Sequence, residues 1–248
     1  MYSGGTASHH MREFGPVLID TSFDFTDAPS GTDPDKHSPT LRQYHKLLWS
    51  KRLPSGRCFS LSDVRLGGSL CLHHRSELGE FFLTSDGIIH TFTRWESFKH
   101  IAETFPEEEH EAFRRIGSTI GARIVFPGNR IDRKNTINGA RGFHPLIKDR
   151  FDLTLECIRG HYLKQDSPLR AVLARYQGFF ALFASFQGYV DFFLLQDLVT
   201  EDYSAVQFFM PFDDFRTPPV PKDRAVYADY RRLSIEFVEA RNRRIDQR

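Results

Sequence analysis

The stretch RCFSLSDVRLGGSLCLHHRSELGEFFLTSDGIIHTF, residues 57–92, decides the fold. It holds four short runs of residues typical of strands: RCFSLS (57–62), SLCLHH (69–74), EFFLTS (80–85) and GIIHTF (87–92). Gly67-Gly68, Gly79 and Asp86-Gly87 separate the runs, and an Asp-Gly pair between two apolar runs is a strong hairpin signal. The sequence therefore predicts an antiparallel β meander with a hairpin at Asp86-Gly87.

The segment before the meander begins with GPVLID (15–20), which favours a strand, and continues as an acidic loop rich in Pro and Gly. Ser38-Pro39 then marks the start of a helix, because Ser caps a first turn and Pro fits within it. The helix continues through TLRQYHKLLWSK (40–51), where Leu41, Tyr44 and Leu48 recur at helical spacing.

The segment after the meander is mostly helical. One strand is expected at ARIVFP (122–127), and VQFFMPFDDF (206–215) is a candidate for a last strand. Helices are expected over residues 96–105, 106–117, 145–163, 168–186, 188–199 and 223–244. The fold class is therefore α+β, with an N-terminal antiparallel β meander packed against a largely helical, Phe-rich C-terminal half.

Composition supports one folded unit. The chain has 248 residues and 24 Phe, which indicates a core of stacked aromatic rings. Residues 1–13 lack a signal peptide and are predicted to be a disordered tail. Residues 14–248 form a single predicted globular domain, β-rich over 14–127 and α-rich over 145–248.

The cysteines and the apolar segments indicate a soluble cytoplasmic protein. Cys58, Cys71 and Cys157 are odd in number and have no metal-binding spacing, so we expect reduced thiols that act as small buried hydrophobic residues. The apolar run 179–199 contains Asp191 and Asp197, which are costly in lipid. We interpret it as two buried helices broken near Gly188, and we expect no membrane-spanning segment.

The segment from Arg123 to Arg141 is the strongest candidate for a ligand site. It has a local net charge of +4, and it places a Gly- and Asn-rich loop between a strand and a helix. Such a loop presents N–H groups and guanidinium donors to an anion. The candidate ligand-binding residues are Asn129, Arg130, Lys134, Asn138 and Arg141. The alternative is a surface loop whose arginines pair with neighbouring acids.

Carboxylates supply the candidates for catalysis. On a helix over 145–163, Asp149, Asp152 and Glu156 would share one gap between two apolar stripes and would suit Mg²⁺. Asp191 lies in an apolar helix and must be paired, capped or catalytic. We therefore predict Asp149, Asp152 and Asp191 as catalytic residues, with a solvated, ion-paired helix face as the alternative.

Other polar residues carry weaker signals. His45, His73 and His74 receive no role, and the chain has neither a GxSxG nor an HExxH motif, which disfavours nucleophilic catalysis. The C-terminal helix is rich in Arg. It therefore supports a competing hypothesis, a non-enzymatic module that binds a protein partner through this helix and through exposed Trp49 or Trp95.

Seven strings resemble a bacterial family known only as a domain of unknown function: DTSFDF (20–25), SPTLRQYHKLLWSK (38–51), SELGEFFLTSD (76–86), FPGNRI (126–131), TINGARGF (136–143), DRFDLTLECIR (149–159) and GYVDFFLLQDLV (188–199). The resemblance implies one intracellular domain and carries over no catalytic residue. The leading hypothesis is an intracellular protein that binds a nucleotide or a nucleic-acid end and acts on it as a metal-assisted enzyme.

Overall fold

Four antiparallel strands form the main sheet of the computed structural model, which describes residues 18–25, 33–93 and 95–247. The strands are β3 (Ser62–Leu66), β4 (Ser69–Ser76), β5 (Gly79–Gly87) and β6 (Arg123–Pro127), in the order β3-β4-β5-β6. Gly67 and Gly68 form the first hairpin with φ values of +55° and +86°, a backbone conformation that glycine adopts without strain. Two further short strands, β1 (Lys51–Arg52) and β2 (Cys58–Phe59), pair with each other.

The prediction of a hairpin at Asp86-Gly87 is wrong. Strand β5 ends at Gly87, and residues 88–92 contain no strand. The fourth strand of the sheet is instead β6, which places Leu83 opposite Pro127 and Gly87 opposite Arg123. Asp86 therefore lies within a strand and not in a turn. Its carboxylate accepts the N–H of Gly87 at 2.8 Å and a hydrogen bond from Arg141, which lies far along the chain.

Two other strand predictions also fail within the described residues. In the GPVLID segment, residues 18–20 carry no strand, and residues 15–17 lie outside the described part of the chain, as does the predicted tail at 1–13. Residues 206–215 form only a single bridge, from Val206 to Val199. The acidic segment before Ser38 contains a short helix, α1 (Pro34–His37), which Asp33 caps by accepting the N–H of Asp35.

The predicted helix at Ser38-Pro39 is confirmed as α2 (Pro39–Trp49), and the Ser38 side chain accepts the N–H of Leu41 as its cap. The next segment forms η2 (Glu96–Phe98), α3 (Lys99–Ala102), α4 (Glu107–Gly117) and η3 (Ile120–Ala122). The long C-terminal helix is confirmed as α10 (Arg224–Asp246), capped by Asp223.

The helix predicted over 145–163 begins six residues late, as α6 (Phe151–Tyr162). Lys148 and Asp149 have φ values of 44° and 69°, and a right-handed helix cannot run through that conformation. Ile147 is nevertheless buried, so the apolar pattern continues through a turn that is not helical. Within the predicted polar loop 128–144, α5 (Ile137–Phe143) forms a short helix capped by Thr136.

The helix predicted over 168–186 is divided into α7 (Arg170–Arg175) and α8 (Gln177–Ala181). The break that we placed near Gly188 lies earlier, because Ser185 caps α9 (Phe186–Phe193) and accepts the N–H of Gly188 at 3.0 Å. A single turn, η4 (Gln196–Leu198), follows. No described helix is both long enough and apolar enough to cross a membrane.

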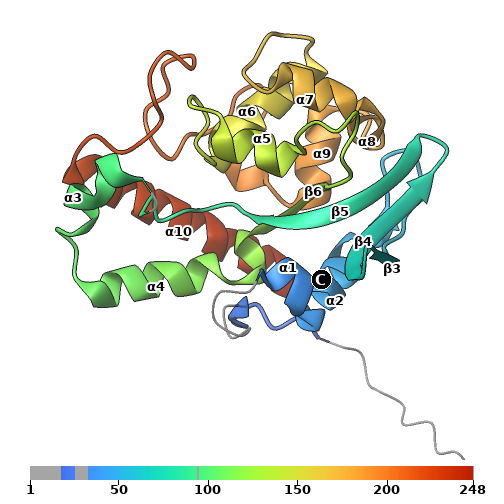
Figure 1. Ribbon diagram of the computed structural model, residues 1–248, viewed down its shortest axis with the longest axis horizontal. Helices are drawn as coiled ribbons and strands as arrows, with labels where there is room; N and C mark the ends of the chain where they lie inside the picture. The colour runs from blue at the N-terminus through green and yellow to red at the C-terminus, as the bar shows by residue number, and fades with distance from the viewer. Residues whose placement is uncertain (1–17, 26–32, 94, 248) are drawn as a thin grey trace, which may run out of the picture.

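The structure confirms the α+β class. Helices α5 to α9 gather on one side of β5 and β6, while α1 and α2 lie on the other side (Figure 1). Phe81 on β5 meets Phe179 with ring centroids 5.7 Å apart and the planes nearly perpendicular. Phe59 on β2 contacts the same ring and also that of Phe183, at 6.1 Å. These phenylalanines join the strands to the C-terminal half, as the composition predicted.

Candidate functional site

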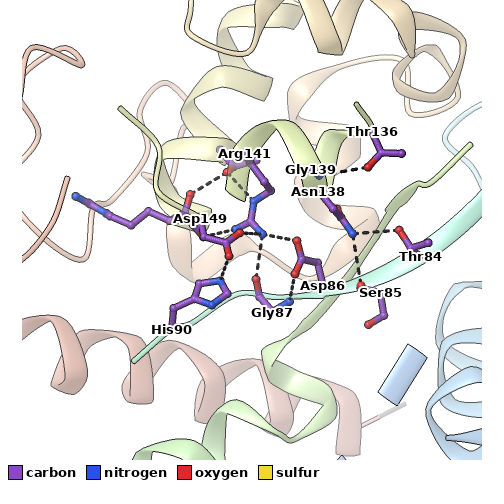
Figure 2. A network of polar contacts seen from close by, with 12 residues as sticks. Thr84, Ser85, Asp86, Gly87, His90, Thr136, Asn138, Gly139, Arg141 and Asp149 are labelled. Atoms are coloured by element: carbon purple, nitrogen blue, oxygen red, sulfur yellow. Dashed lines mark hydrogen bonds and ion pairs between the residues drawn. The ribbon is translucent and has the colours of Figure 1, made fainter. Parts of the chain in front are cut away.

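Arg141, a predicted ligand-binding residue, is part of a buried polar network between α5, β5 and the turn before α6 (Figure 2). Its guanidinium contacts Asp86 Oδ2 at 2.5 Å and Asp149 Oδ1 at 2.9 Å, and its Nε donates to Thr154 at 3.1 Å. Burial disfavours the charge, yet the carboxylates of Asp86 and Asp149 raise the pKa of Arg141 above its usual value. The side chain has 0% exposure, so its donors serve the fold.

Asn138 and Asn129 also hold the fold together. The Asn138 amide donates to Thr84 Oγ1 at 3.1 Å and thereby ties α5 to β5 (Figure 2). The Asn129 amide donates to the carbonyl of Glu80 at 3.5 Å, and the Asn129 carbonyl accepts the hydroxyl of Tyr176. The ligand-binding roles predicted for Asn129, Asn138 and Arg141 therefore find no support in this geometry.

The carboxylates predicted as catalytic lie in three separate polar groups. Asp149 precedes α6 and belongs to the Arg141 network. Asp152 is fully buried, and its oxygens accept Arg150 Nε at 3.0 Å and the N–H of Phe209 at 2.9 Å. Asp191 accepts the Tyr203 hydroxyl at 2.8 Å and the Gln196 amide at 3.0 Å. Each carboxylate already has the partner that its burial requires.

The predicted stripe of Asp149, Asp152 and Glu156 does not form, because the helix begins after Asp149. Glu156 pairs with Arg159 at 2.7 Å instead. Among the described residues, no three His, Cys, Asp or Glu side chains are placed to hold a metal ion. The hypothesis of a Mg²⁺ site therefore gains no set of ligands from the structure.

A hollow lined by cations lies between the loop at 133–135, helix α5 and the region of α7. It has a volume of about 490 Å³. Its lining residues are Arg133, Lys134, Asn135, Ala140, His144, Pro168, Leu169, Ala171, Val172 and Arg175. We call it the cationic hollow. Three of these side chains are permanent cations, five are apolar, and none is a carboxylate.

The cations of this hollow are differently placed. Arg133 and Lys134 are exposed and make no ion pair with any described residue. Arg175 is half-buried and donates to the Asn135 carbonyl at 2.7 Å, which holds the loop against α7. Of the residues predicted from the sequence, Lys134 lines the hollow, whereas Arg130 is exposed outside its lining.

His144 adds a neutral donor to the cationic hollow. Its Nδ1 accepts the N–H of Leu146 at 3.2 Å, so the proton of the neutral ring is assigned to Nε2. Burial lowers the pKa of His144, which favours this neutral form at pH 7. His144 therefore contributes one N–H group, and no positive charge, to the lining residues.

Comparison with known proteins bears on the whole chain. A model of a family of unknown function, DUF6994, matches residues 19–245. The chain belongs to this family. No curated protein matches it, and neither does any solved structure. The resemblance to a domain of unknown function is thus confirmed, and the bacterial origin that it implied stays a prediction.

In this DUF6994 chain, the cysteines show only part of the predicted burial. All three thiols are free. Cys157 is buried, and burial raises its pKa to about 12, so it does not form a thiolate near neutral pH. Cys58 is exposed and Cys71 only partly covered, so the expectation that all three are buried is wrong.

His45 and Ser85 meet on the opposite face of β5 in a pair that resembles part of a catalytic triad. The ring Nε2 lies 3.0 Å from Ser85 Oγ, while Nδ1 accepts the indole N–H of Trp49 at 3.1 Å. Because Trp can only donate, Nε2 carries the proton and donates to Ser85. His45 therefore cannot remove a proton from Ser85, and burial lowers its pKa to about 3.

Asp35 makes the stability of the fold depend on pH. Burial raises its pKa to about 6 from 3.8, and its Oδ1 accepts the N–H of Ser85 at 3.0 Å. From pH 4 to pH 6 the unfolded chain has released this proton while the folded chain retains it, so the contribution of Asp35 to stability falls as pH rises.

Asp35→Asn is uncharged at every pH. We expect its stability relative to the parent to rise by roughly 2–3 kcal/mol between pH 4 and pH 7. Urea unfolding of both proteins at the two pH values measures this change. The exposed Asp166→Asn variant serves as a control without a comparable change. An Asp35→Asn difference that is the same at both pH values would refute the assignment.

Proposed function

We propose that this protein binds a phosphate-bearing ligand in the cationic hollow. The observation that carries the proposal is the lining itself, in which Arg133, Lys134 and Arg175 converge without a carboxylate among them. Cations with no acidic partner have free hydrogen-bond donors, and phosphate is a strong acceptor for such donors. The apolar floor formed by Ala140, Leu169 and Val172 suits the uncharged part of the same ligand.

A base-bearing ligand, either a nucleotide or the end of a single nucleic-acid strand, fits the surroundings of the hollow. Phe143, the last residue of α5, directly precedes His144 and is 85% exposed. Ala140 and Phe143 are three positions apart and therefore neighbours on the helix surface. An exposed aromatic ring beside cations can stack on a base, a contact worth about 1–3 kcal/mol.

Charge reversal in the hollow tests the proposal. In the double variant Arg133→Glu/Lys134→Glu, the affinity for a fluorescein-labelled 12-nucleotide single strand is expected to fall by at least roughly tenfold. The slope of log affinity against log salt should fall by about two, roughly one for each cation. Fluorescence anisotropy at a series of salt concentrations measures both quantities, and ATP and inorganic phosphate serve as competitors.

The matched control is Arg65→Glu/Arg115→Glu, which makes the same change of charge at exposed arginines on β3 and α4. A loss of affinity as large in the control as in the hollow variant would refute the proposal, because it would mean that the strand is held by the overall charge of the protein and not by the hollow. Phe143→Ala separates a base-bearing ligand from bare phosphate. It should weaken the strand and ATP but leave inorganic phosphate unchanged, and competition by ATP as strong as that of the strand would identify a nucleotide.

The competing hypothesis, a protein-binding module built on the basic C-terminal helix, has less support. Arg241 is buried and donates to the carbonyls of Phe193, Gly121 and Arg123. Arg244 forms a two-bond pair with Asp197 at 2.8 and 2.9 Å. These arginines therefore serve contacts within the chain.

The aromatic residues named for that module are not exposed either. Trp49 is 0% exposed, which makes the expectation of an exposed ring wrong. Trp95 is half-buried, and Lys148 Nζ lies 4.1 Å from the centre of its ring. Neither side chain offers a protein partner the flat aromatic patch that the hypothesis needs.

A further inference from the structure

A second cavity lies between the segment 210–222, the start of α6 and the first turn of α10, and it shares no lining residue with the cationic hollow. Its volume is about 490 Å³. Its lining residues are Leu146, Arg150, Leu153, Met210, Pro211, Phe212, Asp213, Phe215, Thr217, Pro218, Pro219, Val220, Lys222 and Val226. We call it the apolar cavity. A concave site of this size with a mostly apolar lining is typical of small-molecule binding.

Arg150 in the lining of the apolar cavity has a hydrogen-bond donor that the fold does not use. Arg150 is 3% exposed and binds Asp152 side-on, through Nε at 3.0 Å and Nη2 at 2.5 Å. Nη2 also reaches the Met210 carbonyl at 3.4 Å. The remaining nitrogen, Nη1, forms no hydrogen bond within the described part of the chain. Arg150 lines the cavity, and Nη1 is not enclosed by protein atoms, so this donor is accessible to a ligand acceptor.

The charged residues nearer solvent favour an anionic acceptor. Lys222 is exposed at the lining and makes no ion pair with a described residue. The one acid of the lining, Asp213, is held by its own loop, where it accepts the N–H of Arg216 at 3.0 Å and the hydroxyl of Thr217 at 2.6 Å. Two donors therefore remain for a ligand, one from Arg150 and one from Lys222.

From this geometry we infer that the apolar cavity binds an amphipathic monocarboxylate, with its hydrocarbon body among Leu146, Leu153 and Val226 and its carboxylate on Arg150 Nη1 and Lys222 Nζ. The binding of such a molecule is independent of the phosphate site. The charge of Arg150 is already balanced by Asp152, so its free N–H orients the ligand carboxylate through a hydrogen bond. The positive charge of Lys222 makes the site prefer an anion to a cation.

The probe is anilinonaphthalene sulfonate, an anionic aromatic dye whose fluorescence rises in an apolar site, displaced by straight-chain carboxylates. We expect one dye per protein. Displacement by hexanoate, octanoate and decanoate should strengthen by about fourfold for each added methylene until the cavity is full. Decylamine, with the same chain and the opposite charge, should displace at least tenfold more weakly than decanoate.

Two variants locate the binding. Val226→Trp places a large ring in the cavity from the first turn of α10 and should abolish dye binding, whereas Ile235→Trp, also partly buried on α10 but outside this lining, should retain it. Lys222→Ala should weaken decanoate several-fold and leave decanol unchanged. Thermal unfolding of each variant without ligand verifies that it is folded.

Three results would overturn the inference: no dye binding by the parent protein, equal displacement by decylamine and decanoate, or unchanged dye binding in a folded Val226→Trp variant. None of them affects the phosphate proposal, because Arg133 and Lys134 are intact throughout.

Discussion

Replacing Arg141 by alanine is expected to destabilise the protein by about 3–5 kcal/mol, because the change leaves two carboxylates in a buried network without their cation. Asp86 and Asp149 lie 2.5 and 2.9 Å from the guanidinium, and Thr154 loses its donor. Urea unfolding followed by circular dichroism measures the loss. Arg141→Ala is therefore unsuited to testing ligand binding, since the variant would lose affinity by unfolding.

Arg232→Ala is the control for this prediction. Arg232 lies on the exposed face of α10 and pairs with Asp229 and Glu236, and such surface pairs contribute about 0–1 kcal/mol each. A loss below about 1.5 kcal/mol for Arg141→Ala, close to that of the control, would contradict the structural role of the network.

Replacing Asp152 by alanine is expected to be similarly costly, again about 3–5 kcal/mol, because Arg150 would remain buried with its charge unpaired. The carboxylate also accepts the N–H groups of Leu153 and Phe209, at 3.0 and 2.9 Å, so it joins α6 to the segment that follows residue 206. The same urea unfolding series measures this change.

Asp152→Asn separates charge from hydrogen bonding. The amide keeps one acceptor oxygen but not the charge. We therefore expect Asp152→Asn to lose most of the free energy of unfolding that Asp152→Ala loses, because the ion pair with Arg150 dominates. Asp166→Ala, at an exposed pair with Arg170, should change the free energy of unfolding by less than about 1 kcal/mol. An Asp152→Ala variant as stable as this control would contradict the account.

Local signals predicted much of the fold. Gly67-Gly68 marks a real hairpin, and Ser38-Pro39 marks a real helix start, because both depend on the backbone preferences of adjacent residues. The helix predicted over 145–163 starts too early because the burial of Ile147 continues the apolar pattern across a left-handed turn. The local sequence predicts a turn at Asp86 because the partner that Asp86 has in the fold, Arg141, lies 55 positions further along the chain.

The site was less predictable because its residues come from separate segments. The local positive charge of the loop predicts Lys134, but nothing in the local sequence predicts Arg175 or His144. Arg175 reaches the loop only because α7 packs beside it. Arg141 and Arg133 belong to the same basic segment, yet one is buried and the other exposed. Composition cannot separate them, since Arg141 is buried only because Asp86 and Asp149 lie where its side chain reaches them in the fold.

The most direct test of phosphate binding is to map the amides that respond to ligand. In nitrogen-15 spectra of the uniformly labelled protein titrated with ATP, and separately with a short single strand, we predict saturable shifts at residues 133–144 and 168–175. These residues contain the whole lining of the cationic hollow. Shifts confined to the exposed face of α10, or no shift with either ligand at millimolar concentration, would contradict the proposal.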